Sequence, residues 1–283
     1  MPLSDYLKAW SLYPLPHHAI SRLVYRLTRI ESQWTQPAIR QFIKVFKVNM
    51  SEAEQVDPNT YKTFNAFFTR SLKPELRPIA SGAKVLASPV DGKISQVEAI
   101  CSGRIFQAKG FDYSVVELLG GDAARAAHFL NGQFTTIYLS PRDYHRIHMP
   151  LAGQLIEQVY IPGRLFSVAG HTVRTIPRLF ARNERVVAIF ETELGKMALV
   201  LVGAINVAAI ETVWAGLITP PNHSAVRVEH YSSVNLAKGA EMGRFNMGST
   251  VIVLLERDNW NWGETQAGQT VKMGMQLAEL ASS

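Results

Sequence analysis

The sequence predicts an α+β fold, with N-terminal amphipathic helices followed by a β-rich body. Three observations point to it: apolar residues recur at helical spacing before residue 70, shorter apolar runs follow, and turn-forming pairs separate those runs. The chain has 283 residues, of which 47% are hydrophobic and 18% charged. This length and composition suit one folded unit with a sizeable core, or one unit with a small appendage.

Residues 1–70 are expected to be helical, because two stretches place apolar residues on one side and basic residues on the other. The apolar positions are Ile20, Leu23, Val24, Leu27 and Ile30 in the first stretch, and Ile39, Phe42, Ile43 and Phe46 in the second. The segment Pro14-Leu15-Pro16 and residue Pro37 break the helical pattern.

After residue 78 the apolar runs are short, as is typical of β-strands. They span residues 84–87, 135–139, 186–190 and 251–255. A longer apolar stretch over 197–210 is interrupted by Asn206 and is expected to form a buried strand. The pairs Asp91-Gly92 and Pro162-Gly163 lie between such runs, and Asp-Gly is a preferred hairpin pair, so a tight turn between strands is expected at Asp91.

Positive charge is concentrated at the N-terminus. The formal net charge is +6, and the first 50 residues hold seven lysines and arginines against two acidic residues. Basic amphipathic helices flanked by aromatic residues can lie in a bilayer interface, although packing of the apolar stripes on the core is an equally good explanation of the pattern. The sequence contains neither the run of about 20 apolar residues that a spanning helix needs nor a signal-peptide series. We therefore expect a protein that stays inside the cell and rests on a membrane.

The densest polar cluster covers residues 140–150. Ser140 and Pro141 suit the start of a short helix that ends at Pro150, and such a helix would place His145 and His148 on the same side. Structural, acid–base and metal-ligand roles all remain open for the two histidines.

Two further features are weak by themselves. The single cysteine, Cys101, excludes an internal disulfide framework and a cysteine-rich zinc site, and no base stands beside it in the sequence. In Gly248-Ser249-Thr250 the serine hydroxyl could attack the preceding carbonyl, but only where the local peptide is bent or strained.

Taken together, these segments resemble the bacterial-type phosphatidylserine decarboxylases, which are pyruvoyl-dependent lipid enzymes. The likeness runs across nearly the whole chain, through residues 63–70, 77–79, 88–95, 108–110, 138–150, 162–163, 179–185, 211–216 and 243–250. One departure is visible, because Met247 stands where the family usually has leucine before Gly-Ser-Thr. Methionine is an apolar substitute of similar volume, so the departure matters little.

The resemblance implies a role for each matching residue. Asp91, His148 and Ser249 match the family's self-processing triad: Asp91 would orient His148 and stabilise its imidazolium, and His148 would take the proton of the Ser249 hydroxyl. Attack on the Gly248 carbonyl, elimination and loss of ammonia would cut the chain between Gly248 and Ser249. The products would be a β chain of residues 1–248 and an α chain of residues 249–283, held together by the apolar run at 251–255. His145 matches a histidine with a part in decarboxylation and is the expected proton donor.

The resemblance also implies cofactor and partners. Ser249 would become a covalent pyruvoyl group that forms a Schiff base with the substrate amine and acts as an electron sink, without a diffusible cofactor or a metal. Expected partners are phosphatidylserine in an anionic membrane and a second copy of the processed protein, but no nucleic acid. Residues 1–70 would be a helical membrane-associating region and residues 71–283 the catalytic domain, peripheral on the cytoplasmic face of the inner membrane.

Four alternatives stand beside this function, and among them a different phosphatidylserine-like lipid as the substrate stays open. A pyruvoyl decarboxylase of soluble amino acids would not need the basic amphipathic N-terminus. A lipoyl- or biotinyl-type carrier would use Lys272 in Val271-Lys272-Met273 and would stay one chain. An esterase with Ser249 as a persistent nucleophile lacks the Gly-x-Ser-x-Gly elbow.

Overall fold

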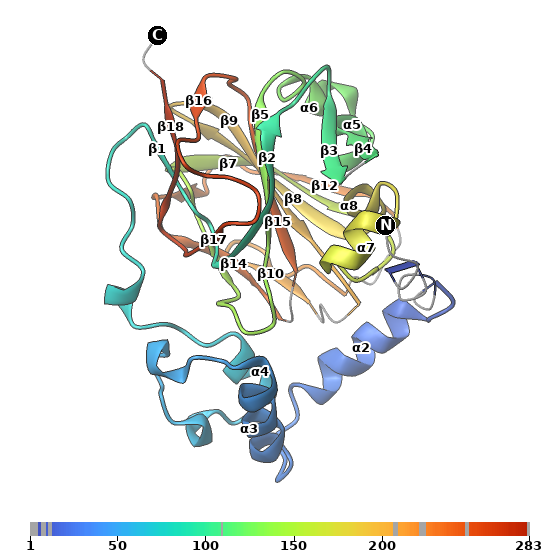
Figure 1. The fold of residues 1–283 in the computed structure, drawn as a ribbon, viewed down its shortest axis with the longest axis vertical. Helices are drawn as coiled ribbons and strands as arrows, with labels where there is room; N and C mark the ends of the chain where they lie inside the picture. Colours follow the sequence, from blue (N-terminus) through green and yellow to red (C-terminus); the bar gives the residue numbers. More distant parts are fainter. Residues whose placement is uncertain are drawn as a thin grey trace.

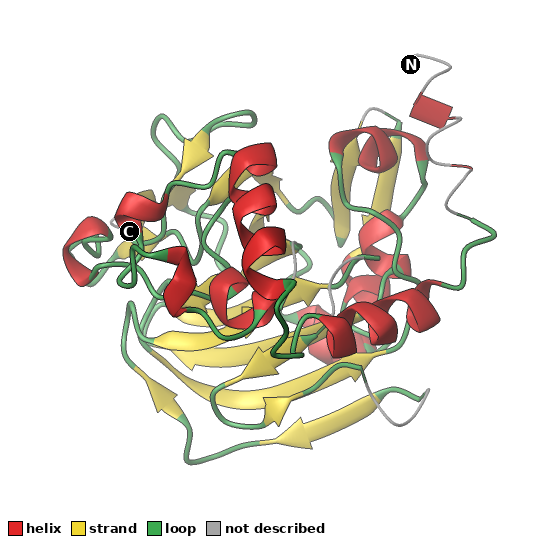
Figure 2. Cartoon of the chain, turned by 90° about the horizontal axis from the view of Figure 1, so that it is seen from below, coloured by secondary structure: helices red, strands yellow, loops and turns green. Residues whose placement is uncertain are grey.

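The structure is a computed structural model that describes residues 5–6, 10, 13–108, 110–205, 209–220, 225–246 and 249–281. Helices come first and a sheet-rich body follows (Figure 1), which confirms the predicted α+β class. Seen from below, the helices gather on one side of the stacked strands (Figure 2).

The body is built around one large antiparallel sheet. Its strands run in the order β12 (Arg227–His230), β7 (Gly153–Ile161), β8 (Arg185–Thr192), β9 (Gly195–Val202), β15 (Thr250–Leu255), β5 (Gln133–Tyr138), β2 (Gly92–Ala99) and β17 (Thr270–Val271), with β13 (Asn235–Leu236) also paired to β7. All six residues of β15 are buried, since strands flank it on both edges and the main hydrophobic core surrounds it. The apolar run at 251–255 is therefore a central strand, as predicted.

Three smaller sheets complete the body. One contains β11 (Gly216–Leu217), β10 (Ile210–Thr212), β14 (Glu241–Phe245) and β6 (Arg146–His148); another contains β1 (Val85–Ala87), β18 (Gln276–Leu280) and β16 (Trp260–Asn261); the last pairs β3 (Arg104–Ala108) with β4 (Phe111–Ser114). The short helix η3 (Pro74–Leu76) precedes the first strand, and four short helices connect later strands: α5 (Val115–Leu118), α6 (Ala123–Ala127), α7 (Gly170–Thr175) and α8 (Leu179–Arg182).

One sequence prediction about local structure is wrong, and another is confirmed only in part. Residues 140–150 do not form a helix, because the segment 146–148 is strand β6, paired with β14, and its Ile147 is fully buried. The Asp143 carboxylate accepts a hydrogen bond from the Ser140 backbone at 2.7 Å and closes a turn instead. At Asp91-Gly92 the chain does bend between β1 and β2, as expected, but the two strands do not form a hairpin, since β1 pairs with β18 while β2 pairs with β5 and β17. In both places pairing with distant strands outweighs the local signal.

The expected strand over 197–210 is confirmed for its first part. Residues 197–202 belong to the buried strand β9, whereas Asn206 lies outside the described residues.

The N-terminal helical prediction is confirmed by α2 (His17–Leu27), α3 (Thr35–Phe46), η1 (Met50–Glu52), η2 (Pro58–Thr60) and α4 (Phe64–Phe68). The two amphipathic helices use their apolar stripes differently. In α3 the stripe faces inward: Ile39 is fully buried, and it forms a small separate core with Val48, Tyr61 and Phe67. This helix matches the core-packing explanation of the sequence pattern.

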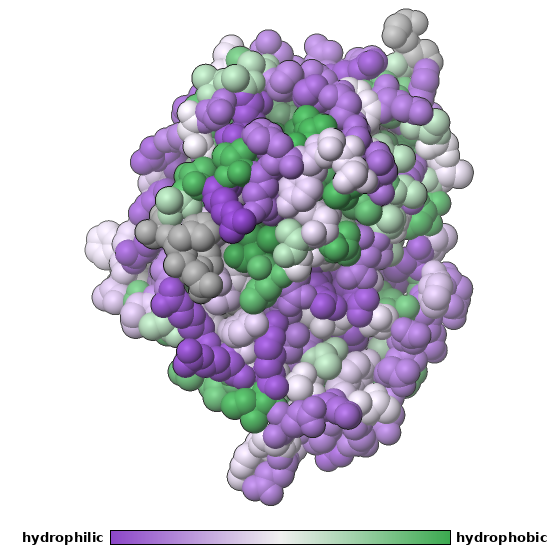
Figure 3. Space-filling model, turned by 180° about the vertical axis from the view of Figure 1, so that it is seen from behind, coloured by the Kyte–Doolittle hydropathy of each residue, from purple (hydrophilic) through white to green (hydrophobic). Residues whose placement is uncertain are grey.

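Helix α2 presents its apolar stripe to solvent. Leu23 and Leu27 are each 56% exposed, and Trp34 beyond the helix is 71% exposed. The residues of α2 that are buried are His17 and Ser21, which are polar. Viewed from behind, the surface is mostly hydrophilic, with hydrophobic residues scattered over its middle and a further hydrophobic patch at the lower end of the molecule, where Figure 1 shows the N-terminal helices (Figure 3). In the described part of the chain, no helix has the length and apolar character needed to cross a membrane.

Candidate active site

Three segments that are far apart in the sequence meet around the predicted site residues. The backbone N–H of His148 donates to the Pro89 carbonyl at 2.9 Å, which joins β6 to the segment that carries Asp91. The N–H of Phe245 donates to the His145 carbonyl at 3.0 Å, and the N–H of Leu139 donates to the Ser249 carbonyl at 2.9 Å. Backbone hydrogen bonds thus hold the segments 88–92 and 139–149 together, and they hold Phe245 and Ser249 beside the second of these segments.

Asp91 is a buried carboxylate surrounded by donors. Arg77 donates to both of its oxygens, Nε at 2.9 Å and Nη2 at 2.6 Å. The Met273 backbone N–H donates at 2.8 Å and Lys272 Nζ at 3.3 Å. Asp91 is only 2% exposed, so these partners compensate the cost of burying its charge. The following glycine is required here, because a Cβ on Gly92 would lie 2.5 Å from the carbonyl oxygen of Tyr138.

His148 has a hydrogen bond at each ring nitrogen. Its Nδ1 lies 2.8 Å from the Gly239 carbonyl oxygen, which can only accept, so Nδ1 carries the proton. Nε2 is then the acceptor, and the Tyr144 hydroxyl donates to it at 3.0 Å. Burial lowers the pKa of His148, although the Gly239 carbonyl and nearby carboxylates, including Asp91, oppose that effect. The described geometry is a neutral imidazole with its basic nitrogen aimed at Tyr144.

His145 is fully buried, and its ring lies 4.2 Å from the Phe68 ring between centroids. Its Nδ1 donates to the Asp143 carbonyl at 2.8 Å, so Nε2 carries the lone pair, and Nε2 has no hydrogen-bond partner among the described residues. Burial, together with the positive charge of Arg70, lowers the pKa of His145 to about 3. His145 is therefore neutral near pH 7 and has an unused basic nitrogen.

Ser249 stands immediately before β15. Its side chain is fully buried, and within the described residues its hydroxyl has no hydrogen-bond partner. Such a hydroxyl costs stability, and an orphan buried polar group calls for an explanation, of which a chemical role is one. Gly248, the other half of the expected cleavage bond, lies outside the described residues.

The structure thus brings the four predicted residues into adjoining segments without linking Asp91, His148 and Ser249 by direct hydrogen bonds. The sequence pattern predicts His145 and His148 on one face of a helix, but in extended chain residues three apart point to opposite sides. It also missed the partners Arg77, Tyr144 and Gly239. In the sequence, Arg77 and Tyr144 are indicated only by their place in the segments 77–79 and 138–150, which resemble the family.

Two cavities with walls of different polarity lie next to the candidate site. A cavity of about 130 Å³ is mostly apolar, and Phe42 and Phe46 of α3, Phe68, Tyr138 and Leu139 contribute to its wall. It is lined by direct neighbours of the site, since Phe68 contacts His145 and Leu139 bonds Ser249.

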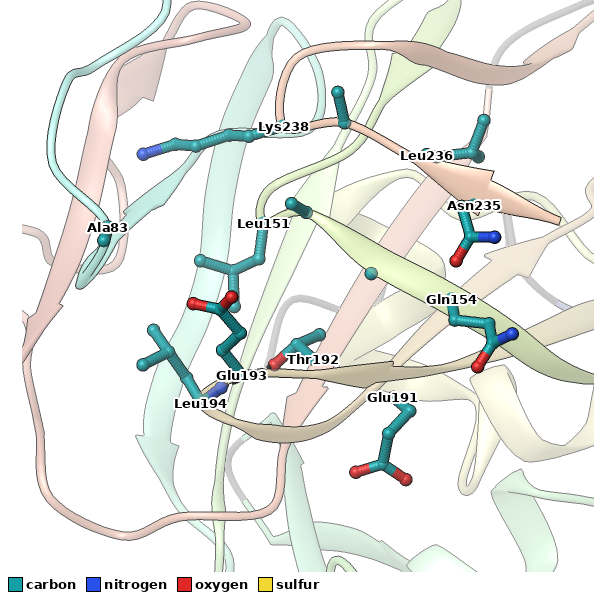
Figure 4. A pocket seen from close by; sticks show the side chains of 13 residues that line it. Ala83, Leu151, Gln154, Glu191, Thr192, Glu193, Leu194, Asn235, Leu236 and Lys238 are labelled. Carbon is teal, nitrogen blue, oxygen red and sulfur yellow. Dashed lines mark hydrogen bonds between the residues drawn. The ribbon is translucent and has the colours of Figure 1, made fainter.

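A second cavity, of about 230 Å³, is polar and contains Asp91, Arg77, Lys272 and Tyr144 in its wall. A third, of about 570 Å³, lies between the ends of β7, β8 and β13 (Figure 4). Residues such as Gln154, Glu191 and Lys238 line this larger cavity, but none of the four predicted site residues does. The candidate site residues and their direct neighbours line the two smaller cavities, so the site is placed there and not at this one.

No group of three or more His, Cys, Asp and Glu side chains is placed to hold a metal ion in the part of the chain that the structure describes.

A family model described as phosphatidylserine decarboxylase matches residues 64–279, and a second, described as PSD, matches residues 7–47. The first match covers most of the chain. The chain belongs to the phosphatidylserine decarboxylase family. This membership agrees with the resemblance seen in the sequence and extends to the N-terminal helices.

Several curated relatives are named phosphatidylserine decarboxylase proenzyme, and each matches this chain over most of its own length. A protein of Alkalilimnicola ehrlichii named phosphatidylserine decarboxylase proenzyme is 60% identical over 254 residues, which cover 88% of this chain and 88% of that protein. Proteins of the same name from Nitrosococcus oceani and Pseudomonas fluorescens are each 54% identical, covering 99% and 94% of this chain and 94% and 95% of their own. The word proenzyme in these names describes proteins that are made as precursors.

Proposed function

We propose that the chain cuts itself between Gly248 and Ser249 and then decarboxylates phosphatidylserine to phosphatidylethanolamine and CO2. The decarboxylation follows from family membership, because this chain is a phosphatidylserine decarboxylase. The position of the cut rests on one observation. The Ser249 hydroxyl is buried, has no hydrogen-bond partner among the described residues, and lies directly before the central strand β15.

Self-cleavage begins when Ser249 Oγ attacks the Gly248 carbonyl carbon and its proton passes to His148 Nε2. The carbon–nitrogen bond breaks, the nitrogen takes up a proton, and an ester joins Gly248 to the Ser249 side chain. Elimination releases the chain ending at Gly248 as a carboxylate and leaves dehydroalanine at position 249. Addition of water to that group and loss of ammonia leave the pyruvoyl group.

His148 can act as this base only if its Nε2 exchanges the Tyr144 hydroxyl for the Ser249 hydroxyl. The other nitrogen need not change, because the bond from Nδ1 to the Gly239 carbonyl already fixes the required tautomer. Asp91 then acts through its charge, which stabilises the imidazolium, while Arg77 and Lys272 hold it in place. The resemblance also implied direct orientation of His148 by Asp91, but in the described part of the chain no hydrogen bond joins these two side chains.

A pyruvoyl group at position 249 fits its surroundings, because the Ser249 side chain is enclosed and the neighbouring cavity is mostly apolar. When present, the group supplies a carbonyl that takes up electrons as CO2 leaves. The same apolar wall excludes water from the reacting carbon.

His145 is the proposed proton donor. A substrate carboxylate entering the site would bring negative charge close to the imidazole and raise its pKa from the low value of the free protein. His145 could then take up a proton at Nε2 and deliver it to the carbon that CO2 leaves. The bond from Nδ1 to the Asp143 carbonyl keeps Nε2 as the exchanging atom.

We place the protein on the cytoplasmic face of the inner membrane as a peripheral protein, acting as a homodimer of the processed form. The outward apolar stripe of α2 and its basic residues support docking on an anionic bilayer. The cleaved α chain would stay bound, because β15 pairs with β9 and β5, and β18 pairs with β1.

The test uses vesicles that contain phosphatidylserine labelled at the serine carboxyl carbon. The processed protein is expected to release labelled CO2 and form phosphatidylethanolamine, whereas a Ser249→Ala variant stays inactive. Labelled free serine in place of the lipid serves as the comparison. Release from free serine but not from the lipid would favour a decarboxylase of soluble amino acids and contradict the proposal.

A further inference from the structure

The end of helix α2 reaches the chain just before the proposed cleavage bond. Arg29, two residues beyond α2, donates through Nη2 to the side-chain oxygen of Asn246 at 3.0 Å. The same nitrogen lies 3.4 Å from Glu211 Oε1 in β10. Asn246 is fully buried, directly follows β14 and precedes Gly248 by two positions in the sequence.

Asn246 is held from several directions. Its backbone N–H donates to the Ala209 carbonyl at 2.9 Å. Its side-chain nitrogen donates to the same carbonyl at 3.2 Å and to Glu211 Oε1 at 3.1 Å. Arg29 completes the set as the donor to the side-chain oxygen, and it is the partner that comes from the N-terminal helices.

Arg29 is itself well fixed. Its guanidinium lies over the Tyr25 ring, 3.8 Å from the centroid, and Nη1 donates to the Tyr25 carbonyl at 3.3 Å. A planar guanidinium can stack on one group while it donates to others, which a lysine ammonium cannot do in the same way. Burial lowers the pKa of Arg29, but an arginine remains charged in proteins.

The other side of the cleavage bond is fixed as well. The Ser249 carbonyl accepts from the Leu139 N–H, and Thr250 is paired in β15 with both Tyr138 and Val202. Attack on a carbonyl carbon depends steeply on approach geometry, and a misplacement of about 1 Å can cost roughly a hundredfold in rate. Firm anchors on both sides of the bond would meet that requirement.

We propose that Arg29 is a positioning residue for self-cleavage, and that through Asn246 it holds the chain that leads into the Gly248–Ser249 bond. The inference rests on the proposed function, since it assumes cleavage at that bond. It also gives the N-terminal helices a second task besides membrane docking, because the residue that anchors the cleavage segment stands at the end of the membrane-facing helix.

The test follows cleavage of the freshly synthesised full chain over time in a cell-free translation reaction. Arg29→Met is expected to cleave at least roughly tenfold more slowly than the wild type. Arg29→Lys, which keeps the charge, should recover part of the rate. In the double variant Arg29→Met/Asn246→Ala the two effects should not add, because both substitutions remove the same link.

Arg244 offers a matched control. It donates to the other oxygen of Glu211 at 2.7 Å, whereas Asn246 is bound to Oε1. Arg244→Met should therefore cleave within about twofold of the wild type.

Wild-type cleavage kinetics in Arg29→Met, or equal slowing in Arg244→Met, would overturn the assignment. If Arg29→Met proves misfolded by circular dichroism, Arg29→Lys and Asn246→Ala decide the question. An uncleaved wild-type chain would instead overturn the proposed function, so the two failures are distinguishable.

Discussion

The outward stripe of α2 should bind membranes in proportion to the apolar surface it leaves exposed. Leu23 and Leu27 lie on the same side of the helix, and each side chain is 56% exposed. The double substitution Leu23→Ser/Leu27→Ser removes this surface without opening the core, so the free energy of unfolding should change by under about 1 kcal/mol.

The size of the effect follows from the exposed fraction. Complete burial of a leucine side chain stabilises by about 1.5–3 kcal/mol, and roughly half of each side chain remains to be buried. Each leucine should then contribute about 1 kcal/mol to membrane partitioning, and the pair about 2 kcal/mol. That corresponds to a loss of roughly 30-fold in the partition coefficient.

Sedimentation with vesicles of anionic, non-substrate lipid measures this directly. Phe106→Ser is the control, because Phe106 is 37% exposed in β3, a strand of the sheet-rich body and not of the N-terminal helices (Figure 1). The reasoning is refuted if the double variant binds as tightly as the wild type, or if Phe106→Ser loses as much.

Three further predictions concern stability and pH. Ile39→Ala should destabilise the protein by about 2–5 kcal/mol in chemical denaturation, since Ile39 fills the core between α3 and α4; a loss below about 1 kcal/mol would contradict that packing. In the folded protein the pKa of His145 is lowered to about 3, below the pKa of an unfolded histidine, so the unfolded chain binds more protons as the pH falls. The free energy of unfolding should therefore decrease by about 2 kcal/mol from pH 6.5 to pH 5. An equally steep decrease in a His145→Gln variant would contradict this assignment to His145. Tyr144→Phe removes the hydroxyl that donates to neutral His148, so the pKa of His148 should rise and the pH profile of self-cleavage should shift to higher pH. An unshifted profile would show that the Tyr144 hydroxyl is not bonded to His148 in the reacting precursor.

The sequence predicted the fold where local periodicity and tertiary packing agree. The run at 251–255 is fully apolar, and it became the central strand β15. Periodicity could not separate α2 from α3, because both have an apolar stripe opposite basic residues. The difference lies in what each helix meets: α3 packs on Tyr61 and Phe67, whereas α2 contacts the body through His17.

At the site, the sequence supplied the residues but not their connections. Asp91, His145, His148 and Ser249 came from a resemblance, and the structure sets them in adjoining segments. Their hydrogen-bond partners could not be derived, because strand pairing brings them from distant parts of the chain. Lys272 shows this well: the sequence suggested a carrier lysine, but in the structure it approaches the Asp91 carboxylate from beyond the cleavage point.

The central claim is that Ser249 becomes the N-terminal group of a separate chain. Intact masses of the purified wild-type and Ser249→Ala proteins under denaturing conditions test it. The account predicts two wild-type chains that meet at Gly248 and Ser249, with the smaller one lighter by one ammonia than simple hydrolysis would leave it, and a single uncut variant chain. A folded wild-type protein that remains one chain, or a smaller chain that begins with an intact serine, would contradict it.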